Sequence, residues 1–335
     1  MATSGTYTYL CTASDIITAA LEDIGVLAAG QTVDATDNTT AIRTLQMLAK
    51  QWMGTTDFAP GLKSWTRYRL FLFMAYNQAV YYVGPGATDD NAATGFRRYT
   101  LASAAALGAS SITVTNSSVV YQPDQADAPS LSTTYNIGIM LDGNPATMQW
   151  TTINGAPVVG GTTTAITLTA VTTGAASAGN YVYVYQSKPQ RPIEVETMTL
   201  LNASNITMPI RIYTDVGEYE AVNQKSALGD PLAVLVEPLQ THTRITTNYT
   251  AYDVTKQLRM QVLYPTQDYS SSANDIEYPQ QWYAALEWEL AKRLSPKYGA
   301  EWTQQMETSR SEALAIARQQ EPARTSLYFQ PGKDY

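Results

Sequence analysis

Apolar residues recur at a helical spacing in four stretches, two near each end of the chain, which predicts four amphipathic helices. The first follows Thr12 or Ser14, either of which can cap a helix, and it stops at Gly25, a residue suited to helix ends. The second extends from about residue 37 to residue 53. Neither helix can bury its apolar side alone, so both need partners. The side chains expected to face inward are Ile17, Leu21, Ile24, Leu45, Leu48 and Trp52.

The partners are expected from the other end of the chain. A third helix is predicted over residues 279–294, where Pro279 suits the first turn and Ser295-Pro296 should end the helix because proline clashes with a continuing turn. A fourth is predicted over about residues 300–320, with Trp302, Met306, Ala313 and Ala317 facing inward. The inward face of the third helix consists of Trp282, Leu286, Leu290 and Leu294.

Between these helices the pattern becomes that of β-strands. Residues 65–73 and 78–83 predict two strands joined by a turn. A second β-rich region resumes the same sheet after Arg191-Pro192. Its predicted strands are residues 193–200, 210–214, 232–236, 243–247 and 257–263.

A charge-poor segment lies between these two regions. No basic residue occurs between Arg98 and Lys188, and the only acids there are Asp124, Asp127 and Asp142. Short β-branched and aromatic runs alternate with hairpin turn sequences, which predicts a small β-sandwich or barrel; the alternative is a disordered Thr/Ala/Gly linker. The strands are expected at residues 111–115, 136–141, 148–153, 165–169 and 181–185.

The expected fold class is α+β. A helical bundle made from the N- and C-terminal segments is interrupted by a large all-β insertion of β-sandwich or barrel modules, as a chain of 335 residues allows. The predicted parts are the helical body at 1–60 and 269–322, the β-platform at 61–100 and 188–268, the charge-poor insert at 101–187, and a C-terminal tail at 323–335.

Composition excludes several kinds of function. The net charge of −8 has the wrong sign for a protein that grips nucleic acid through its phosphates. With one cysteine and one histidine, the chain cannot form an intramolecular disulfide. It also has very few of the residues that zinc sites and Ser-His-Asp triads require. We therefore expect no enzyme, no metal and no cofactor. Cys11 is interpreted as a small apolar residue near the first helix and His242 as a plain strand residue.

The chain shows no apolar run long enough to cross a bilayer, and its first ten residues lack the basic start and apolar core of a secretory signal. We expect no membrane anchor and intracellular synthesis. The 23 tyrosines and 6 tryptophans stand beside only 5 phenylalanines. Because aromatic side chains with a polar tip suit contact surfaces as well as cores, this excess indicates either a large subunit interface or packing within the chain.

Three groups of side chains have a functional and a plainer interpretation. Acids on the predicted strands could pair as the acid and base of a glycosidase, or be solvated charges. An aromatic stripe could bind carbohydrate, or belong to a core or interface. A basic cluster could meet an acidic partner, or be exposed sheet charge. The acids are Glu194, Glu196, Asp215, Glu218 and Glu220; the stripe is Trp150, Tyr181, Tyr183 and Tyr185; the cluster is Arg67, Arg69, Arg97 and Arg98.

Three helical segments, Ala19 to Gly25, Leu48 to Gly54 and Pro279 to Gly299, resemble the head-to-tail adaptor proteins of short-tailed bacteriophages, also called connector, packaged-DNA stabilisation or tail-accessory proteins. The last includes the run Pro-x-x-Trp-x-x-Ala-Leu and a Pro-x-Tyr-Gly ending. The stretch Glu218 to Pro231 is similar to one found in the longer members with β-inserts. The resemblance covers about two-fifths of the chain, and the shortest adaptors lack both β-regions.

The resemblance implies a structural virion protein at the head–tail junction, made in the host cytoplasm. About twelve copies would form a homo-oligomeric ring under the portal protein, meet tail nozzle, fibre or spike proteins, and let double-stranded DNA pass without sequence-specific binding. The alternative is a receptor- or glycan-binding tail component that uses the β-modules. In the adaptor, the C-terminal tail docks on the portal, and that role falls here on Arg324, Leu327, Tyr328, Phe329, Pro331 and Tyr335.

Overall fold

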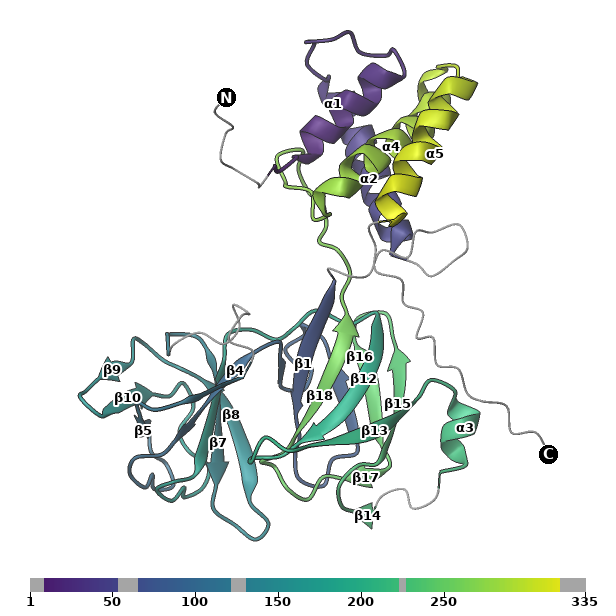
Figure 1. Cartoon of the computed structure of the whole chain (residues 1–335). Helices are drawn as coiled ribbons and strands as arrows, with labels where there is room; N and C mark the ends of the chain where they lie inside the picture. The colour runs from purple at the N-terminus through teal and green to yellow at the C-terminus, as the bar shows by residue number, and fades with distance from the viewer. Residues whose placement is uncertain (1–8, 54–65, 122–130, 223–226, 320–335) are drawn as a thin grey trace, which may run out of the picture. The chain divides into compact units, whose positions relative to one another are not determined.

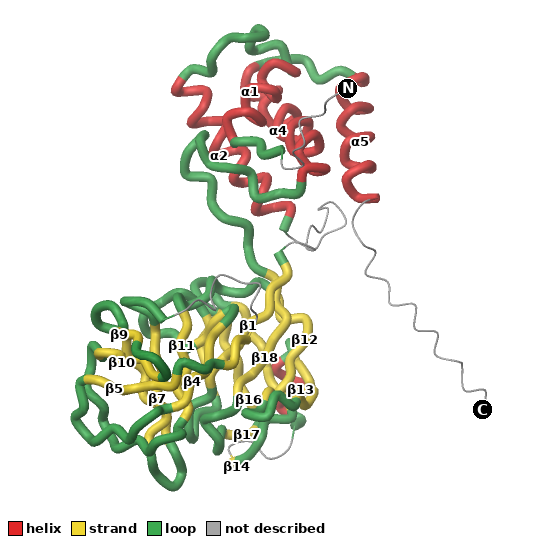
Figure 2. Tube along the Cα trace, turned by 60° about the vertical axis from the view of Figure 1, so that its left-hand side comes forward, coloured by secondary structure: helices red, strands yellow, loops and turns green. Residues whose placement is uncertain are grey.

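The computed structural model describes residues 9–53, 66–121, 131–222 and 227–319. It is a mixed α and β structure with a few helices and a large β-rich region (Figure 1). The chain divides into two compact units, one formed by residues 1–66 and 265–335 and the other by residues 67–264. The first contains the four long helices and the second contains the sheets, as the colours of Figure 2 show. The tail residues from Arg324 to Tyr335 lie outside the described residues.

The first unit contains α1 (Ala13–Asp23), α2 (Ala35–Trp52), α4 (Tyr283–Tyr298), α5 (Gln304–Gln319) and a 3-10 turn at Gln280–Trp282. Thr12 caps α1 as predicted: its hydroxyl accepts from the Asp15 amide, while the Asp15 carboxylate accepts from the Thr12 amide. Asp34 caps α2 through the Thr36 amide. Both α1 and α2 therefore begin where a side chain replaces a missing backbone partner.

The predicted end of the third helix at Ser295-Pro296 is wrong. Pro296 lies inside α4, which continues to Tyr298 and ends at Gly299 in a left-handed conformation with φ of 66°. Proline removes one backbone donor, but so close to the C-terminus the loss is small, and the Ser295 carbonyl accepts from the Ala300 amide at 3.0 Å. The left-handed glycine, rather than the proline, terminates the helix.

Helix α4 packs against α1, α2 and α5, and their apolar faces share one buried cluster. Trp52 of α2 and Trp282 meet edge to face with ring centroids 5.7 Å apart. Tyr298 of α4 donates to Asp37 of α2 at 3.0 Å. On α5, Ala317 is buried and Ala313 partly buried, and Trp302 ahead of it is also partly buried, but Met306 lies outside the cluster. The inward face predicted for the fourth helix is therefore only partly correct.

The second unit is built on an eight-stranded, nearly closed sheet. Its edge strand β2 meets the segment beside β3, because the Asp90 amide donates to the Tyr82 carbonyl at 2.8 Å and the Asp90 carboxylate accepts from the Tyr82 amide at 2.7 Å. The strand order is β2 (Val80–Val83), β16 (Thr243–Thr247), β15 (Ala233–Pro238), β13 (Thr207–Tyr213), β12 (Glu194–Leu201), β18 (Gln257–Leu263), β1 (Arg67–Phe73) and β3 (Ala92–Ala93).

This order confirms that the strands after Arg191-Pro192 join the sheet begun at β1. It also confirms the two strands and the turn predicted over residues 65–83, with the turn at residues 76–77. The two strands do not pair with each other, because β1 pairs with β18 and β3, while β2 pairs with β16. Alternate side chains of the sheet fill one core, in which Leu70 lies opposite Met260. The neighbouring elements β14 (Ala227–Leu228) and β17 (Tyr249–Thr250) form a short parallel pair, and α3 (Val216–Glu220) packs near β13 and β15.

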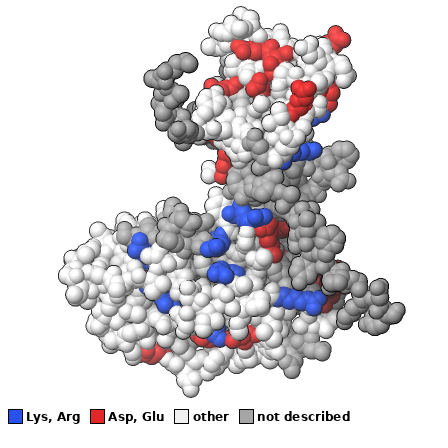
Figure 3. Space-filling model, viewed as in Figure 1, with Lys and Arg blue, Asp and Glu red and all other residues white. Residues whose placement is uncertain are grey.

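The charge-poor segment forms two further sheets around a second core, so its described part is not a disordered linker. Both sheets are antiparallel, and the five predicted strands are confirmed with bounds shifted by up to two residues. The surface over β5, β9 and β10 is uncharged on the face seen in Figure 3. One sheet is β6 (Val119–Tyr121), β4 (Phe96–Thr100), β11 (Tyr181–Tyr185), β7 (Asn136–Leu141) and β8 (Thr147–Thr152); the other is β5 (Ser111–Thr115), β10 (Thr163–Thr167) and β9 (Val158–Val159).

The predicted module boundary at residue 100 differs from the sheet boundary. β4 precedes it but pairs with β11 of the charge-poor segment, with Tyr99 opposite Val182. β1 joins the two sheets by burying both of its faces: Leu70 and Leu72 enter the core of the large sheet, while Phe71 and Phe73 contact the aromatic side of the smaller one. A strand that is buried on both faces has apolar residues at consecutive positions, which explains why residues 70–73 are all apolar.

Candidate functional site

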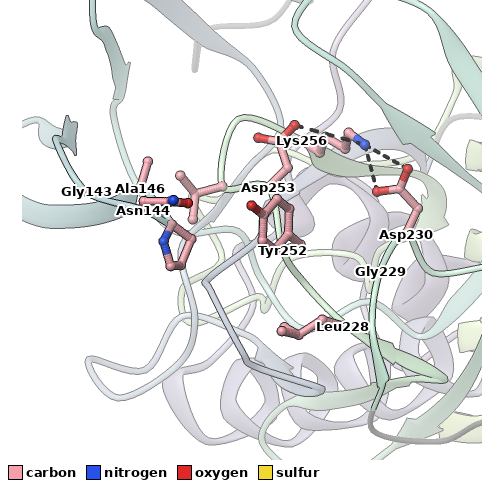
Figure 4. Close-up of a pocket in the computed structure, with 11 residues that line it drawn as sticks. Gly143, Asn144, Ala146, Leu228, Gly229, Asp230, Tyr252, Asp253 and Lys256 are labelled. Atoms are coloured by element: carbon pink, nitrogen blue, oxygen red, sulfur yellow. Dashed lines mark hydrogen bonds and ion pairs between the residues drawn. The ribbon is translucent and has the colours of Figure 1, made fainter.

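A cavity of about 680 Å³ lies in the second unit, where three loops converge. One wall is the turn between β7 and β8, residues 143–146. The other is formed by residues 228–230, at and after β14, and by residues 252–256, between β17 and β18. In Figure 4, Tyr252 stands between the turn residues on one side and Lys256 with Asp230 on the other.

The β7–β8 turn is held in shape by its first residue. The Asp142 carboxylate accepts from the Ser177 amide at 3.0 Å, the Ser177 hydroxyl at 2.8 Å and the Asn180 side chain at 2.8 Å. These hydrogen bonds lower the pKa of Asp142, because they favour its charged form. Gly143 is required next, since a Cβ there would lie 2.8 Å from the Pro145 carbonyl oxygen. The turn therefore presents Asn144, Pro145 and Ala146 in a defined geometry.

The opposite wall carries an ionic cluster. The ammonium of Lys256 lies 2.7 Å from both carboxylate oxygens of Asp230 and 4.0 Å from one oxygen of Asp253. The other Asp253 oxygen accepts from the amide and hydroxyl of Thr255, at 2.9 and 2.7 Å. Two carboxylates share one cation, so the cluster carries one net negative charge.

Two apolar side chains in the cavity are exposed to solvent. Tyr252 is 52% exposed and Leu228 is 49% exposed. The Tyr252 ring meets Tyr76 edge to face, with centroids 6.5 Å apart, which restricts its orientation. The cavity thus combines an aromatic surface with hydrogen-bond acceptors at fixed positions, the combination typical of small-molecule sites.

A second cavity, of about 310 Å³, lies in the helical unit and is lined by residues 267–269 and 274–277. Its acids have structural partners. Asp268 accepts from Lys50 at 2.7 Å and from Gln46 at 2.6 Å, and hydrogen bonds from these side chains lower its pKa. Glu277 accepts from the Gln267 amide at 2.5 Å. Asp268 thus holds the 266–278 segment against α2, and Glu277 bridges two parts of that segment.

Two of the five acids suspected of catalysis, Glu196 and Asp215, have structural roles. Glu196 pairs with Arg67 at 2.8 Å, at a bulge in the pairing of β12 with β18. Asp215 caps α3, accepting from the Glu218 amide at 2.9 Å. The glycosidase interpretation therefore has no geometric support from Glu196 or Asp215.

The aromatic stripe lies inside the unit. Tyr183 and Tyr185 are fully buried, and Trp150 is partly buried against Phe73, with ring centroids 4.8 Å apart. Burial raises the pKa of both tyrosines above the usual range. These rings form the contact between the eight-stranded sheet and the five-stranded sheet. Packing within the chain therefore explains part of the tyrosine excess.

The arginines named as a basic cluster also contact their own chain. Arg98 donates to the Ala203 carbonyl at 2.7 Å and lies over the Tyr181 ring, 4.6 Å from its centroid. His242 lies just before β16 rather than on a strand, with its ring against Tyr82. Cys11 is buried beside the cap of α1, as predicted.

The ten helical packing residues all lie in the buried cluster of the helical unit: Ile17, Leu21, Ile24, Leu45, Leu48, Trp52, Trp282, Leu286, Leu290 and Leu294. The main cavity was not predicted, because its walls come from three distant stretches. Among the described residues no helix is long and apolar enough for a membrane span, and no group of three metal-binding side chains is found.

No family model and no curated protein matches the chain.

Proposed function

We propose that this chain is a structural subunit of the head–tail junction of a short-tailed bacteriophage. About twelve copies form a ring between the portal protein and the tail, and double-stranded DNA passes through the ring without being gripped. In this proposal the helices form a bundle made from both ends of the chain, and the β-rich unit is a large all-β insertion in it.

The observation that carries the proposal is the shared core of α1, α2, α4 and α5. Helices more than 200 residues apart in sequence bury Trp52 against Trp282. Among the side chains considered for chemistry, Glu196 forms an ion pair and Asp215 caps a helix. The resemblance of the helical segments to adaptors and the net charge of −8 agree with a subunit that assembles around DNA rather than binding it.

The ring is expected to dock through residues 323–335. The test is size-exclusion chromatography with light scattering on the full chain, alone and mixed with the portal ring of the same virion. The matched variants delete residues 323–335 or replace only Leu327, Tyr328 and Phe329 by serine. Both variants should lose the portal complex while the helices remain folded. A portal complex that survives both changes would contradict docking by the tail.

A receptor- or glycan-binding tail component remains the second candidate. The observation that favours it is the cavity around Tyr252. In the predicted aromatic stripe, Tyr183 and Tyr185 are fully buried and the other two rings are partly buried, so the stripe does not present a continuous aromatic surface. Deleting residues 101–187 is a poor test of it. The deletion would leave β4 without β11 and expose Phe71 and Phe73. Point changes in the cavity separate the two candidates more cleanly.

A further inference from the structure

We propose that the cavity between the β7–β8 turn and the loops at residues 228–230 and 252–256 binds a neutral saccharide. The inference rests on the lining of this cavity and does not depend on the adaptor role. The result of the portal-binding experiments above has no bearing on it.

The first element of the site is the Tyr252 ring. A tyrosine with half of its surface in water leaves an apolar face unburied, and its contact with Tyr76 keeps that face from turning freely. Sugar rings present apolar C–H faces that pack on aromatic rings, burying surface at little conformational cost because the ring is already held. Leu228 extends the apolar surface.

The second element is the pair of carboxylates. An ionised carboxylate can accept about four hydrogen bonds. Asp230 accepts two from Lys256, and one oxygen of Asp253 accepts two from Thr255, so acceptor capacity is left on both. Each side chain is 37% exposed. Sugar hydroxyls are donors that suit such acceptors, and the Lys256 bridge holds Asp230 in place before the ligand arrives.

The third element is the opposite wall, which is uncharged. Gly143, Asn144, Pro145 and Ala146 supply an amide and apolar contacts but no ionic group. The net negative charge of the Asp230, Asp253 and Lys256 cluster would repel a phosphate or other anion. A cationic peptide would find acidic partners on this wall but none on the 143–146 wall. A volume of about 680 Å³ is larger than a single side chain needs and falls within the range of small-ligand sites. A ligand with many hydroxyls and no net charge fits both walls.

The test is saturation-transfer-difference NMR on the full chain with a panel of neutral oligosaccharides, including maltotriose, cellotriose, lactose and triacetylchitotriose, and with an arginine-containing tripeptide as the cationic probe. At least one oligosaccharide should bind, with little change between 50 and 500 mM salt. Tyr252→Ala and Asn144→Ala, on opposite walls, should each weaken its binding at least tenfold, whereas Tyr252→Phe should retain most of it.

Tyr9→Ala is the matched control, because Tyr9 is 67% exposed and lies in the helical unit. It should leave saccharide binding unchanged. Three results would overturn the proposal: no oligosaccharide in the panel binds, binding survives both Tyr252→Ala and Asn144→Ala, or the tripeptide binds in preference and is displaced by salt.

Discussion

The carboxyl groups of Asp23 and Glu287 lie within hydrogen-bonding reach of each other where α1 packs against α4. Burial raises the pKa of Glu287 to about 7, and the charge of Asp23 adds to the effect. Burial also raises the pKa of Asp23, with Glu22 nearby, and one oxygen of Asp23 is buried without a hydrogen-bond partner. Two ionised carboxylates so placed repel each other, so the pair shares a proton at neutral pH.

The helical unit should therefore become less stable as the pH rises through neutrality. The folded pKa of Glu287, about 7, lies above its usual 4.5, so the stabilisation is complete below pH 4.5 and is lost as the pH passes 7. Glu287→Gln removes this dependence. The variant and the unchanged protein should have similar free energies of unfolding at pH 5, and the variant should be more stable by about 1 kcal/mol at pH 8.5, after discounting for partial exposure.

Urea unfolding at both pH values measures this difference. Glu312→Gln is the control, because Glu312 is exposed on α5, and its effect should be the same at both pH values. A difference between Glu287→Gln and the unchanged protein that does not vary with pH would show that the pair does not share a proton.

Glu307 should hold α5 against α4. Its carboxylate accepts from Arg310 at 2.6 Å and from Lys292 at 2.8 Å, which lowers its pKa to about 2, and it also accepts from the Trp302 indole at 2.9 Å. The stabilisation is present above the usual pKa of 4.5 and is lost as the pH falls toward 2. Since about a third of the Glu307 side chain is exposed and solvent screens its ion pairs, Glu307→Gln should cost about 0.5–1 kcal/mol at pH 7.

Hydrogen exchange of the α5 amides reports this loss directly, because α5 is the element released. The difference between Glu307→Gln and the unchanged protein should shrink in 1 M salt, which screens exposed charges. Equal exchange rates in both proteins at low salt would show that Glu307 does not hold α5 against α4.

Gly138 should be needed because the Trp150 ring lies across it. A Cβ at residue 138 would come within 2.7 Å of two carbons of the Trp150 ring, which is itself packed against Phe73 and Tyr185. Gly138→Ala should lower the free energy of unfolding by about 1–3 kcal/mol, since the ring can move only by disturbing its neighbours. Gly161→Ala, where the added carbon meets nothing within 4 Å, should change it by less than about 0.5 kcal/mol. Thermal unfolding of both variants makes the comparison, and an equal effect would contradict the packing argument.

Local patterns in the sequence were enough to place most elements. Thr12 with Asp15 marks the start of α1, and alternating side chains such as those of Tyr181 to Tyr185 mark a strand. These signals are read within a few residues and depend on caps and side-chain period alone. The end of α4 was predicted wrongly at Pro296, because proline usually ends helices. Here Gly299 ends the helix three residues later.

Long-range pairing was beyond such signals. Nothing near β1 and β2 shows that they lie in different parts of the sheet order, since that order depends on which distant strand offers a matching face. The same holds for the cavity. Tyr252 and Asn144 are separated by more than 100 residues, and neither stretch carries a motif, so only the folded arrangement brings them to one site.

Assembly of this chain into a ring can be tested on the purified protein. Native mass spectrometry of the purified full chain, with and without its portal, counts the copies directly. We expect a closed complex of about twelve chains, either by itself or formed on the portal, with few intermediate species. A chain that stays monomeric at every concentration and in the presence of the portal would contradict it.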